Sequence, residues 1–267
     1  MMMDKPLYLV IPAAGFGKRM KAVNAEIPKE MLPVGNKPAI LYAVEEGLSA
    51  GINNIIIVIN RQKEMIRKYF EDRKFMAKRG CSITFLYQSE PLGESDAISL
   101  AEDIVINHAV AILYPDNIYF PAPGALKILK DVFRRYGKDI VALMEVTDEN
   151  SGGISNSGRV DLSLLDDDIF HVKKFYPKGD GHFIKRFRGE LRTCGITISG
   201  PHIFEYIKRL RGSIKEGEFT DVPVRSLMLE EKGLIGFYLP GKVFDIGNPV
   251  GYEFCLSYIK KGNFMAM

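Results

Sequence analysis

The most informative part of this chain is LYLVIPAAGFGKRMKAVNAEIPKEMLPVGNKP, residues 7–38. It begins with LYLVI, an apolar run with the length and composition of a buried β-strand. The small residues of PAAGFG follow, and they let the backbone come close to a ligand. Two cations, Lys18 and Arg19, come next, and Lys29 lies ten residues after Arg19. A strand, a small-residue turn and clustered cations predict a site for a phosphorylated ligand, bound by backbone N–H groups and side-chain charges.

Two well-known glycine loops do not fit this stretch. The dinucleotide-binding pattern GxGxxG needs glycine where the chain has Met20. The Walker pattern needs Ser or Thr where the chain has Arg19, and Gly where it has Pro12. An ordinary strand–turn–helix connection with solvated cations is the simpler alternative. The added segment PKEMLPVGNKP, with prolines spaced through an apolar loop, favours a ligand site over that alternative.

The motifs of this region resemble a known family. AAGFGKRM followed by IPKEMLPVGNKPAI is similar to the signature of the sugar-1-phosphate nucleotidyltransferases, above all the bacterial UTP–glucose-1-phosphate uridylyltransferases. Weaker matches in QSEPLGESDA, YPDN and GKVFDIGNPVGY extend the resemblance over nearly the whole chain. The resemblance implies a Rossmann-like three-layer α/β/α fold with a mainly parallel, mixed sheet. It also implies Mg²⁺-dependent nucleotidyl transfer from a nucleoside triphosphate, UTP by first choice, to a sugar 1-phosphate such as glucose 1-phosphate, with release of pyrophosphate.

Size and composition agree with an ordinary globular protein. A chain of 267 residues is long enough for one large α/β domain with a substantial core. The net charge of +3 is too small to predict nucleic-acid binding. Three widely spaced cysteines match neither a zinc site nor a disulfide framework, so a reducing cytoplasm is expected. No apolar stretch has the length of a membrane span, and the N-terminus does not resemble a signal peptide.

Strands and helices are predicted to alternate in the first half of the chain. Apolar runs predict strands at residues 7–11, 55–59, 82–87 and 110–113, and helical spacing predicts helices at 38–48, from 64 to 70 and onward, and at 97–106. This alternation favours a doubly wound parallel sheet, with ligands at the carboxyl ends of its strands.

The second half of the chain has a more mixed pattern. We expect helices at 125–136, 201–210 and 222–232, strands at 140–146, 193–199 and 235–239, a loop at 151–158, and short strands within 160–187. No linker or repeat interrupts the sequence. The expectation is a single domain of residues 1–267, with a nucleotide-binding half of about 1–124 and an acceptor-binding half of about 125–267.

Two aspartates are candidate metal ligands. Asp116 follows an apolar strand, and Asp245 lies at the strand-to-loop junction in GKVFDIGN. Each alone could equally be a turn or helix-capping carboxylate. Mg²⁺ keeps several waters and takes one or two protein carboxylates with phosphate oxygens, so two aspartates suffice. The resemblance implies that the matching aspartates hold this ion.

The resemblance also assigns residues to the nucleotide. Arg19 and Lys29 are expected to hold the triphosphate. Gln88 and Gly93 are expected to read the edge of a pyrimidine. The remaining nucleotide-binding positions are in the opening loop: Ala13, Ala14, Gly15 and Gly17. This chain departs from the family pattern after Gly93, where it has ESDA, and Asp96 near the ribose or base would alter which nucleotide is accepted.

The segment expected to bind the acceptor departs further from the family pattern. The family carries Glu-Lys-Pro at the end of a central strand, the Glu for sugar hydroxyls and the Lys for the phosphate. The nearest match places Lys174 at the phosphate-binding lysine and Lys173, in place of the glutamate, among the expected acceptor-binding residues. A lysine cannot accept hydrogen bonds from hydroxyls, so either the sugar contact has moved or the acceptor is not glucose 1-phosphate. Gly158 and Gly195 match two close-approach glycines near the sugar.

Two alternative functions remain open from the sequence. Thymidylyl transfer to glucose 1-phosphate is the nearest, since Asp116-Asn117 also fits those enzymes. A non-catalytic nucleotide-binding or sugar-nucleotide-binding protein is the second, and the retention of Arg19 and Lys29 together with both aspartates argues against it. The expected partners are a nucleoside triphosphate and a sugar 1-phosphate, with no nucleic acid and no membrane. Family members are often homo-oligomers, so the resemblance also leaves open whether this chain forms one.

Overall fold

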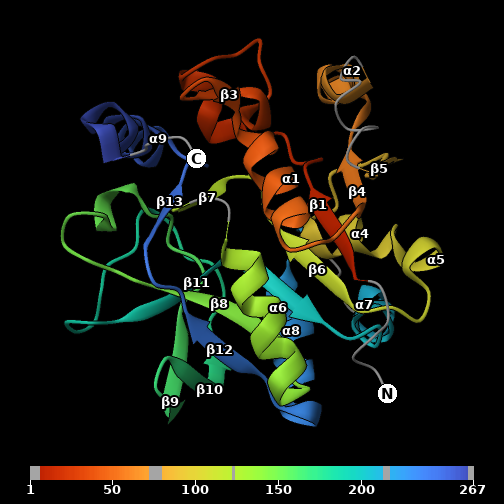
Figure 1. The fold of residues 1–267 in the computed structure, drawn as a ribbon, viewed down its shortest axis with the longest axis vertical. Helices are drawn as coiled ribbons and strands as arrows, with labels where there is room; N and C mark the ends of the chain where they lie inside the picture. Colours follow the sequence, from red (N-terminus) through yellow and green to blue (C-terminus); the bar gives the residue numbers. More distant parts are fainter. Residues whose placement is uncertain (1–6, 72–79, 122–123, 213–216, 264–267) are drawn as a thin grey trace.

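The computed structural model describes residues 7–71, 80–121, 124–212 and 217–263, and it is built around a nine-stranded sheet (Figure 1). The strand order is β5-β4-β1-β6-β11-β8-β12-β10-β9. The strands are β1 (Tyr8–Pro12), β4 (Asn54–Ile59), β5 (Ser82–Tyr87), β6 (Val110–Leu113), β8 (Ile140–Glu145), β9 (Val160–Asp166), β10 (Ile169–Phe175), β11 (Leu191–Ser199) and β12 (Ile235–Tyr238). The predicted strands of the first half therefore all exist.

The sheet is mixed and mainly parallel, as predicted. The pairs β5–β4, β4–β1, β1–β6 and β8–β12 are parallel, whereas β11 and β10 are antiparallel to both of their neighbours. Seven strands thus run one way and two run the other way. The continuous apolar runs of β1, β4 and β6 are buried because helices cover both faces of the sheet, as is usual for parallel strands.

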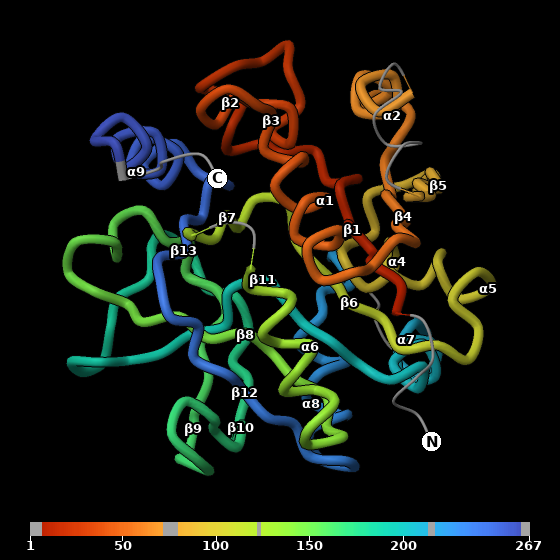
Figure 2. Tube along the Cα trace, in the orientation of Figure 1, coloured from red at the N-terminus to blue at the C-terminus, as the bar shows by residue number. Residues whose placement is uncertain are grey.

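Helices cover the two faces of the sheet and make the three layers that the sequence predicts (Figure 1, Figure 2). On one face lie α1 (Ala39–Ser49), α2 (Glu64–Glu71) and α6 (Ala125–Tyr136). On the other lie α4 (Glu94–Ser99), α5 (Glu102–Val105), α7 (Ile203–Arg211) and α8 (Asp221–Lys232). Among the described residues, no helix is long and apolar enough to cross a membrane.

The predicted helix at 97–106 is wrong in its extent. The chain forms two short helices there, α4 and α5, because Leu100 and Ala101 make tighter hydrogen bonds, to the carbonyls of Ala97 and Ile98 three residues back. The helix predicted from 64 onward is α2, and its continuation beyond residue 71 lies outside the described residues.

Three small regions support one end of the site, and of these only the strand just before Asp245 was expected from the sequence. Strand β7 (Asn117–Phe120) pairs antiparallel with β13 (Lys242–Asp245). Helix α9 (Pro249–Tyr258) follows β13, and the Asn248 side chain caps it by accepting a hydrogen bond from the N–H of Gly251 at 2.9 Å. A short hairpin, β2 (Pro33–Val34) and β3 (Lys37–Pro38), lies beside them. Buried side chains of all three regions share one apolar cluster.

A buried carboxylate joins the two halves of the chain on one face of the sheet. Glu46 of α1 is 4% exposed and accepts hydrogen bonds from the N–H groups of Gly124, at 2.9 Å, and Leu126, at 3.1 Å. These donors are free N–H groups at the start of α6, which lack partners within the helix. Burial raises the pKa of Glu46, and the two N–H groups act against that rise.

We expect Glu46→Ala to destabilise the protein by about 1–2 kcal/mol and to lower Tm by roughly 2–8 °C, because the start of α6 loses its cap. The matched control is Glu45→Ala, which removes only a partly exposed ion pair with Lys37 and should cost less than about 1 kcal/mol. Thermal unfolding followed by circular dichroism compares the two variants. Equal Tm values would contradict the capping role.

Candidate active site

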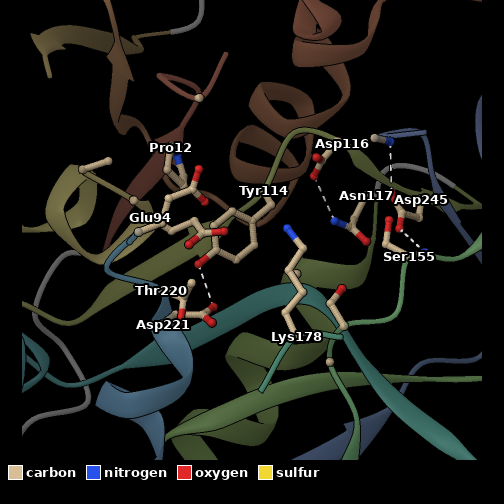
Figure 3. Close-up of a pocket in the computed structure, with 18 of the residues that line it drawn as sticks. Pro12, Glu94, Tyr114, Asp116, Asn117, Ser155, Lys178, Thr220, Asp221 and Asp245 are labelled. Carbon is tan, nitrogen blue, oxygen red and sulfur yellow. Dashed lines mark hydrogen bonds between the residues drawn. The ribbon is translucent and has the colours of Figure 1, made fainter. Parts of the chain in front are cut away.

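A cavity of about 400 Å³ opens at the carboxyl ends of β1 and β6 (Figure 3). The loop after β1, the end of β6 and the starts of α4 and α8 line it, together with segments from the second half of the chain. Most of the residues that the sequence singled out line this cavity: Ala14, Gly15, Gly17, Arg19, Lys29, Gln88, Gly93, Asp116, Gly158, Gly195 and Asp245. Three do not: Ala13, Lys173 and Lys174.

The centre of the site is an ion pair between Lys29 and Asp116. Lys29 Nζ lies 2.5 Å from Asp116 Oδ2, and each side chain is 19% exposed. Burial alone would lower the pKa of Lys29, but the charges of Asp116 and Glu30 outweigh it and hold this pKa above its usual value. Burial alone would raise the pKa of Asp116, and the charge of Lys29 reverses that effect. Both groups are therefore ionised near neutral pH.

Asp245 converges on the same point because β13 pairs with β7, which puts Asp245 opposite Asn117, the residue next to Asp116. Asp245 Oδ2 accepts a hydrogen bond from the N–H of Ser155 at 2.9 Å, and its Oδ1 accepts one from the N–H of Gly247 at 3.0 Å (Figure 3). A Cβ on Gly247 would lie 2.8 Å from Asp116 Oδ2 and 3.1 Å from Asp245 Oδ1. The two carboxylates thus border one small space that only glycine leaves open.

This pair of carboxylates fits a magnesium ion that keeps most of its waters. Hard oxygen ligands suit Mg²⁺, and the space beside Gly247 lies between them. Within the described residues there is no group of three or more His, Cys, Asp or Glu side chains that would form a complete protein cage. The site therefore suits an ion that takes its remaining ligands from water and from a bound phosphate.

Further cations surround the carboxylates. Arg19 Nη1 donates to Ser155 Oγ at 2.6 Å, which ties the opening loop to the second half of the chain. Arg192, which the sequence reasoning missed, is 3% exposed and lines the cavity. Its Nε donates to the carbonyl of Thr193, and among the described residues no partner contacts its buried Nη1. Arg192 had no motif to identify it, because its position depends on the pairing of β11.

The opening loop is held from beneath by buried polar groups. Lys63 Nζ donates to the carbonyl of Ala13 at 2.7 Å and to both carboxylate oxygens of Glu30 at 2.8 Å. Asn60 Nδ2 donates to the carbonyl of Ala14. The N–H of Ala13 donates to Val58. Both backbone polar groups of Ala13 are thus used within the protein, which explains why it does not line the cavity.

The expected base-reading residue, Gln88, has a fixed orientation. Its Nε2 donates to the carbonyl of Gly93 at 3.1 Å and to Asp96 Oδ2 at 2.8 Å, while Asp96 Oδ1 pairs with Arg211. A carboxylate accepts hydrogen bonds, so the amide nitrogen of Gln88 faces Asp96 and the amide oxygen is left for a ligand. Asp96 is buried behind Gln88 and does not line the cavity.

The glycines near the base and the acceptor are required by close approach. Gly93 has φ 112°, and a Cβ there would lie 2.5 Å from the backbone of Phe219. Gly158 has φ 76° and Gly195 has φ 74°, and a Cβ on either would overlap a neighbouring side chain or carbonyl. All three glycines line the cavity.

The lysines of β10 are not where the sequence placed them. Lys173 and Lys174 are exposed, and Lys174 Nζ lies over the ring of Tyr176 at 4.6 Å. The cation of this segment that lines the cavity is Lys178, beyond the end of β10, and its side chain extends into the cavity (Figure 3). The resemblance matched lysines within the strand itself. In the structure β10 ends at Phe175, and the chain turns before Lys178 reaches the cavity.

Comparison with known proteins agrees with this geometry. Residues 8–175 match the family model described as "Nucleotidyl transferase". The chain belongs to the nucleotidyl transferase family. As a nucleotidyl transferase it is 28% identical to a UTP–glucose-1-phosphate uridylyltransferase of Staphylococcus epidermidis, over 94% of this chain and 91% of that enzyme. It is 30% identical to one from Bacillus subtilis, over 91% of this chain and 85% of that enzyme.

Solved structures give the same result for the fold. A UDP-glucose pyrophosphorylase solved in complex with UDP-glucose has 27% identity and a TM-score of 0.80, with 96% of this chain and all of that chain covered. A UTP-bound enzyme from Acinetobacter baumannii, at 22% identity and a TM-score of 0.78, shares the fold. The family resemblance and the fold class inferred from the sequence are both confirmed.

Proposed function

We propose that this nucleotidyl transferase makes UDP-glucose and pyrophosphate from UTP and glucose 1-phosphate, with Mg²⁺. The observation that carries the proposal is the convergence of Asp116 and Asp245 beside Lys29 and Arg19 in one cavity. The relatives that match most of this chain are UTP–glucose-1-phosphate uridylyltransferases.

The reaction needs charge and position rather than a protein base. A phosphate oxygen of the acceptor is already ionised, and it attacks the α-phosphorus of the triphosphate. A new P–O bond forms, the bond from the α-phosphorus to the oxygen bridging to the β-phosphorus breaks, and pyrophosphate leaves with that electron pair. Catalysis by in-line positioning and charge neutralisation fits this chemistry.

The residues divide between the two reactants. Arg19 and Lys29 bind triphosphate oxygens, and Asp116 with Asp245 would hold the ion. When bound, Mg²⁺ supplies positive charge to phosphate oxygens. Because Lys29 already contacts Asp116, it keeps the carboxylate ionised and lies beside the phosphates that the ion would bind.

The orientation of Gln88 supports a uracil base. An amide oxygen accepts a hydrogen bond from the N3–H of uracil, whereas cytosine carries an acceptor at that atom. Thymine has the same imide edge as uracil, so dTTP is the competing donor, and the thymidylyl reaction remains the second candidate.

For the acceptor we propose Lys178 in place of Lys174 as the lysine that binds the phosphate. Lys178 lines the cavity, whereas Lys174 is exposed and packs over Tyr176. Lys173 lies outside the cavity, so its position does not support a contact with the acceptor. Gly158 and Gly195 line the same cavity, where the lack of a side chain at each leaves room for the acceptor.

Pyrophosphate release tests the function directly. We expect Mg²⁺-dependent turnover with UTP and glucose 1-phosphate, tested beside dTTP, CTP, ATP and GTP and a panel of other sugar 1-phosphates. Asp116→Ala should abolish turnover while leaving the fold intact. If no substrate pair gave turnover although UTP still bound, the result would favour a non-catalytic binding protein instead.

The two lysine positions make a matched pair. Lys178→Ala should raise the KM for glucose 1-phosphate by roughly 10–100-fold, because a charge-assisted contact to phosphate is lost. Lys174→Ala should leave that KM within about twofold, since its side chain lies outside the cavity. The assignment is wrong if steady-state kinetics show the reverse order.

A further inference from the structure

A carboxyl group in the cavity has an oxygen without a partner. Glu94 is the first residue of α4, and it lines the cavity next to Gly93. Its Oε2 is buried, and no donor within the described residues contacts it. Buried polar atoms in proteins are nearly always hydrogen-bonded, so an orphaned carboxyl oxygen facing a ligand cavity indicates a donor supplied by the ligand.

The neighbours of Glu94 show that this is not a general feature of the wall. Asp221, at the start of α8, also lines the cavity, but its Oδ2 accepts from Tyr114 Oη at 2.7 Å and from Arg225 Nη2 at 2.9 Å (Figure 3). The Asp221 carboxylate therefore has protein partners at its Oδ2, whereas the Glu94 Oε2 has none among the described residues. Burial, together with the nearby charge of Asp221, raises the pKa of Glu94 to about 7.

The charges that face Glu94 come from several elements. Asp221 and Glu218 act to raise its pKa, whereas Lys178 acts to lower it. Tyr114, at the end of β6, is held on Asp221, and its own pKa lies well above the usual value because of burial. Glu94 and Lys178, the lysine proposed for the acceptor phosphate, line the same cavity (Figure 3).

Lys173, at the position where the sequence placed an acceptor contact, does not line the cavity. Glucose 1-phosphate held by Lys178 would bring its ring hydroxyls toward Glu94. A hydroxyl is a donor, and a carboxylate oxygen is an acceptor, so the two match.

We propose that Glu94 determines acceptor specificity by accepting a hydrogen bond from a ring hydroxyl of the sugar 1-phosphate. This proposal rests on the function proposed above. Asp221, Tyr114 and Arg225 form the fixed wall beside it. The acceptor class is therefore a hydroxylated sugar 1-phosphate, and a deoxy sugar lacking the contacted hydroxyl binds more weakly.

The test separates the acceptor from the nucleotide. Purified wild type, Glu94→Leu and Glu94→Gln are assayed with UTP and glucose 1-phosphate, and both KM values are measured. Glu94→Leu should raise the KM of glucose 1-phosphate by about tenfold or more and leave the KM of UTP within about twofold. Glu94→Gln keeps an acceptor oxygen and should have a smaller effect. Glu90→Gln, an exposed position in the same loop, is the control.

Deoxyglucose 1-phosphates identify the hydrogen bond itself. Wild type should discriminate against one of the deoxy analogues by about tenfold or more, and Glu94→Leu should lose that discrimination. If Glu94 had only a structural role, Glu94→Leu would still discriminate between glucose 1-phosphate and the deoxy analogue.

The pH profile gives an independent readout. The carboxylate form is the stronger acceptor, so the wild-type KM for the sugar should rise as pH falls through about 7. In Glu94→Gln the pH dependence due to Glu94 is lost, while that due to the substrate phosphate remains. The difference between the wild-type and Glu94→Gln pH profiles therefore reports the titration of Glu94.

Turnover with an unchanged acceptor KM and unchanged discrimination in Glu94→Leu would overturn the assignment of Glu94 alone. Absence of turnover in wild type would overturn the proposed function and this assignment with it. Unfolding of Glu94→Leu is monitored by Tm, and Glu94→Gln decides the question if the leucine variant does not fold.

Discussion

The ion pair of Lys29 with Asp116 is the interaction on which the site depends. Two carboxylates, those of the partly exposed Asp116 and the buried Asp245, border the same small space, and their repulsion requires a nearby positive charge. Lys29 supplies that charge from the loop after β1. The pairing of β7 with β13 brings the aspartates together from positions far apart in the sequence. The catalytic groups therefore depend on a long-range strand pairing and on the conformation of one loop.

That loop is fixed by a second, buried ion pair immediately beside the first. Glu30 follows Lys29 in the chain, and it points the other way, to Lys63 below the loop. Burial lowers the pKa of Lys63 although Glu30 acts to raise it. A buried ion pair of this kind contributes little net stability, since desolvation offsets the attraction. Its structural effect is to direct neighbouring residues to opposite sides, which turns Lys29 toward the cavity.

Sequence reasoning predicted the features that are local. Strands β1, β4 and β6 are apolar runs and β5 is rich in apolar residues. The opening loop follows β1, and Asp116 follows β6. It did not predict what depends on distant contacts. Lys178 reaches the cavity only after a turn beyond β10, Arg192 lines it because of the pairing of β11, and Asp96 lies behind Gln88 rather than against a ligand. Helix α9 was missed because the weakly amphipathic sequence after Pro249 gave no clear periodic signal.

The central claim is that the space between Asp116 and Asp245 holds a magnesium ion with the triphosphate. The most direct test is UTP binding by titration calorimetry, with Mg²⁺ and with chelator, in wild type and in Gly247→Ala. The alanine methyl would occupy that space without removing a charge. The account predicts that Mg²⁺ tightens UTP binding to wild type by about tenfold or more and has little effect on Gly247→Ala. Equal tightening of both proteins by Mg²⁺ would contradict it.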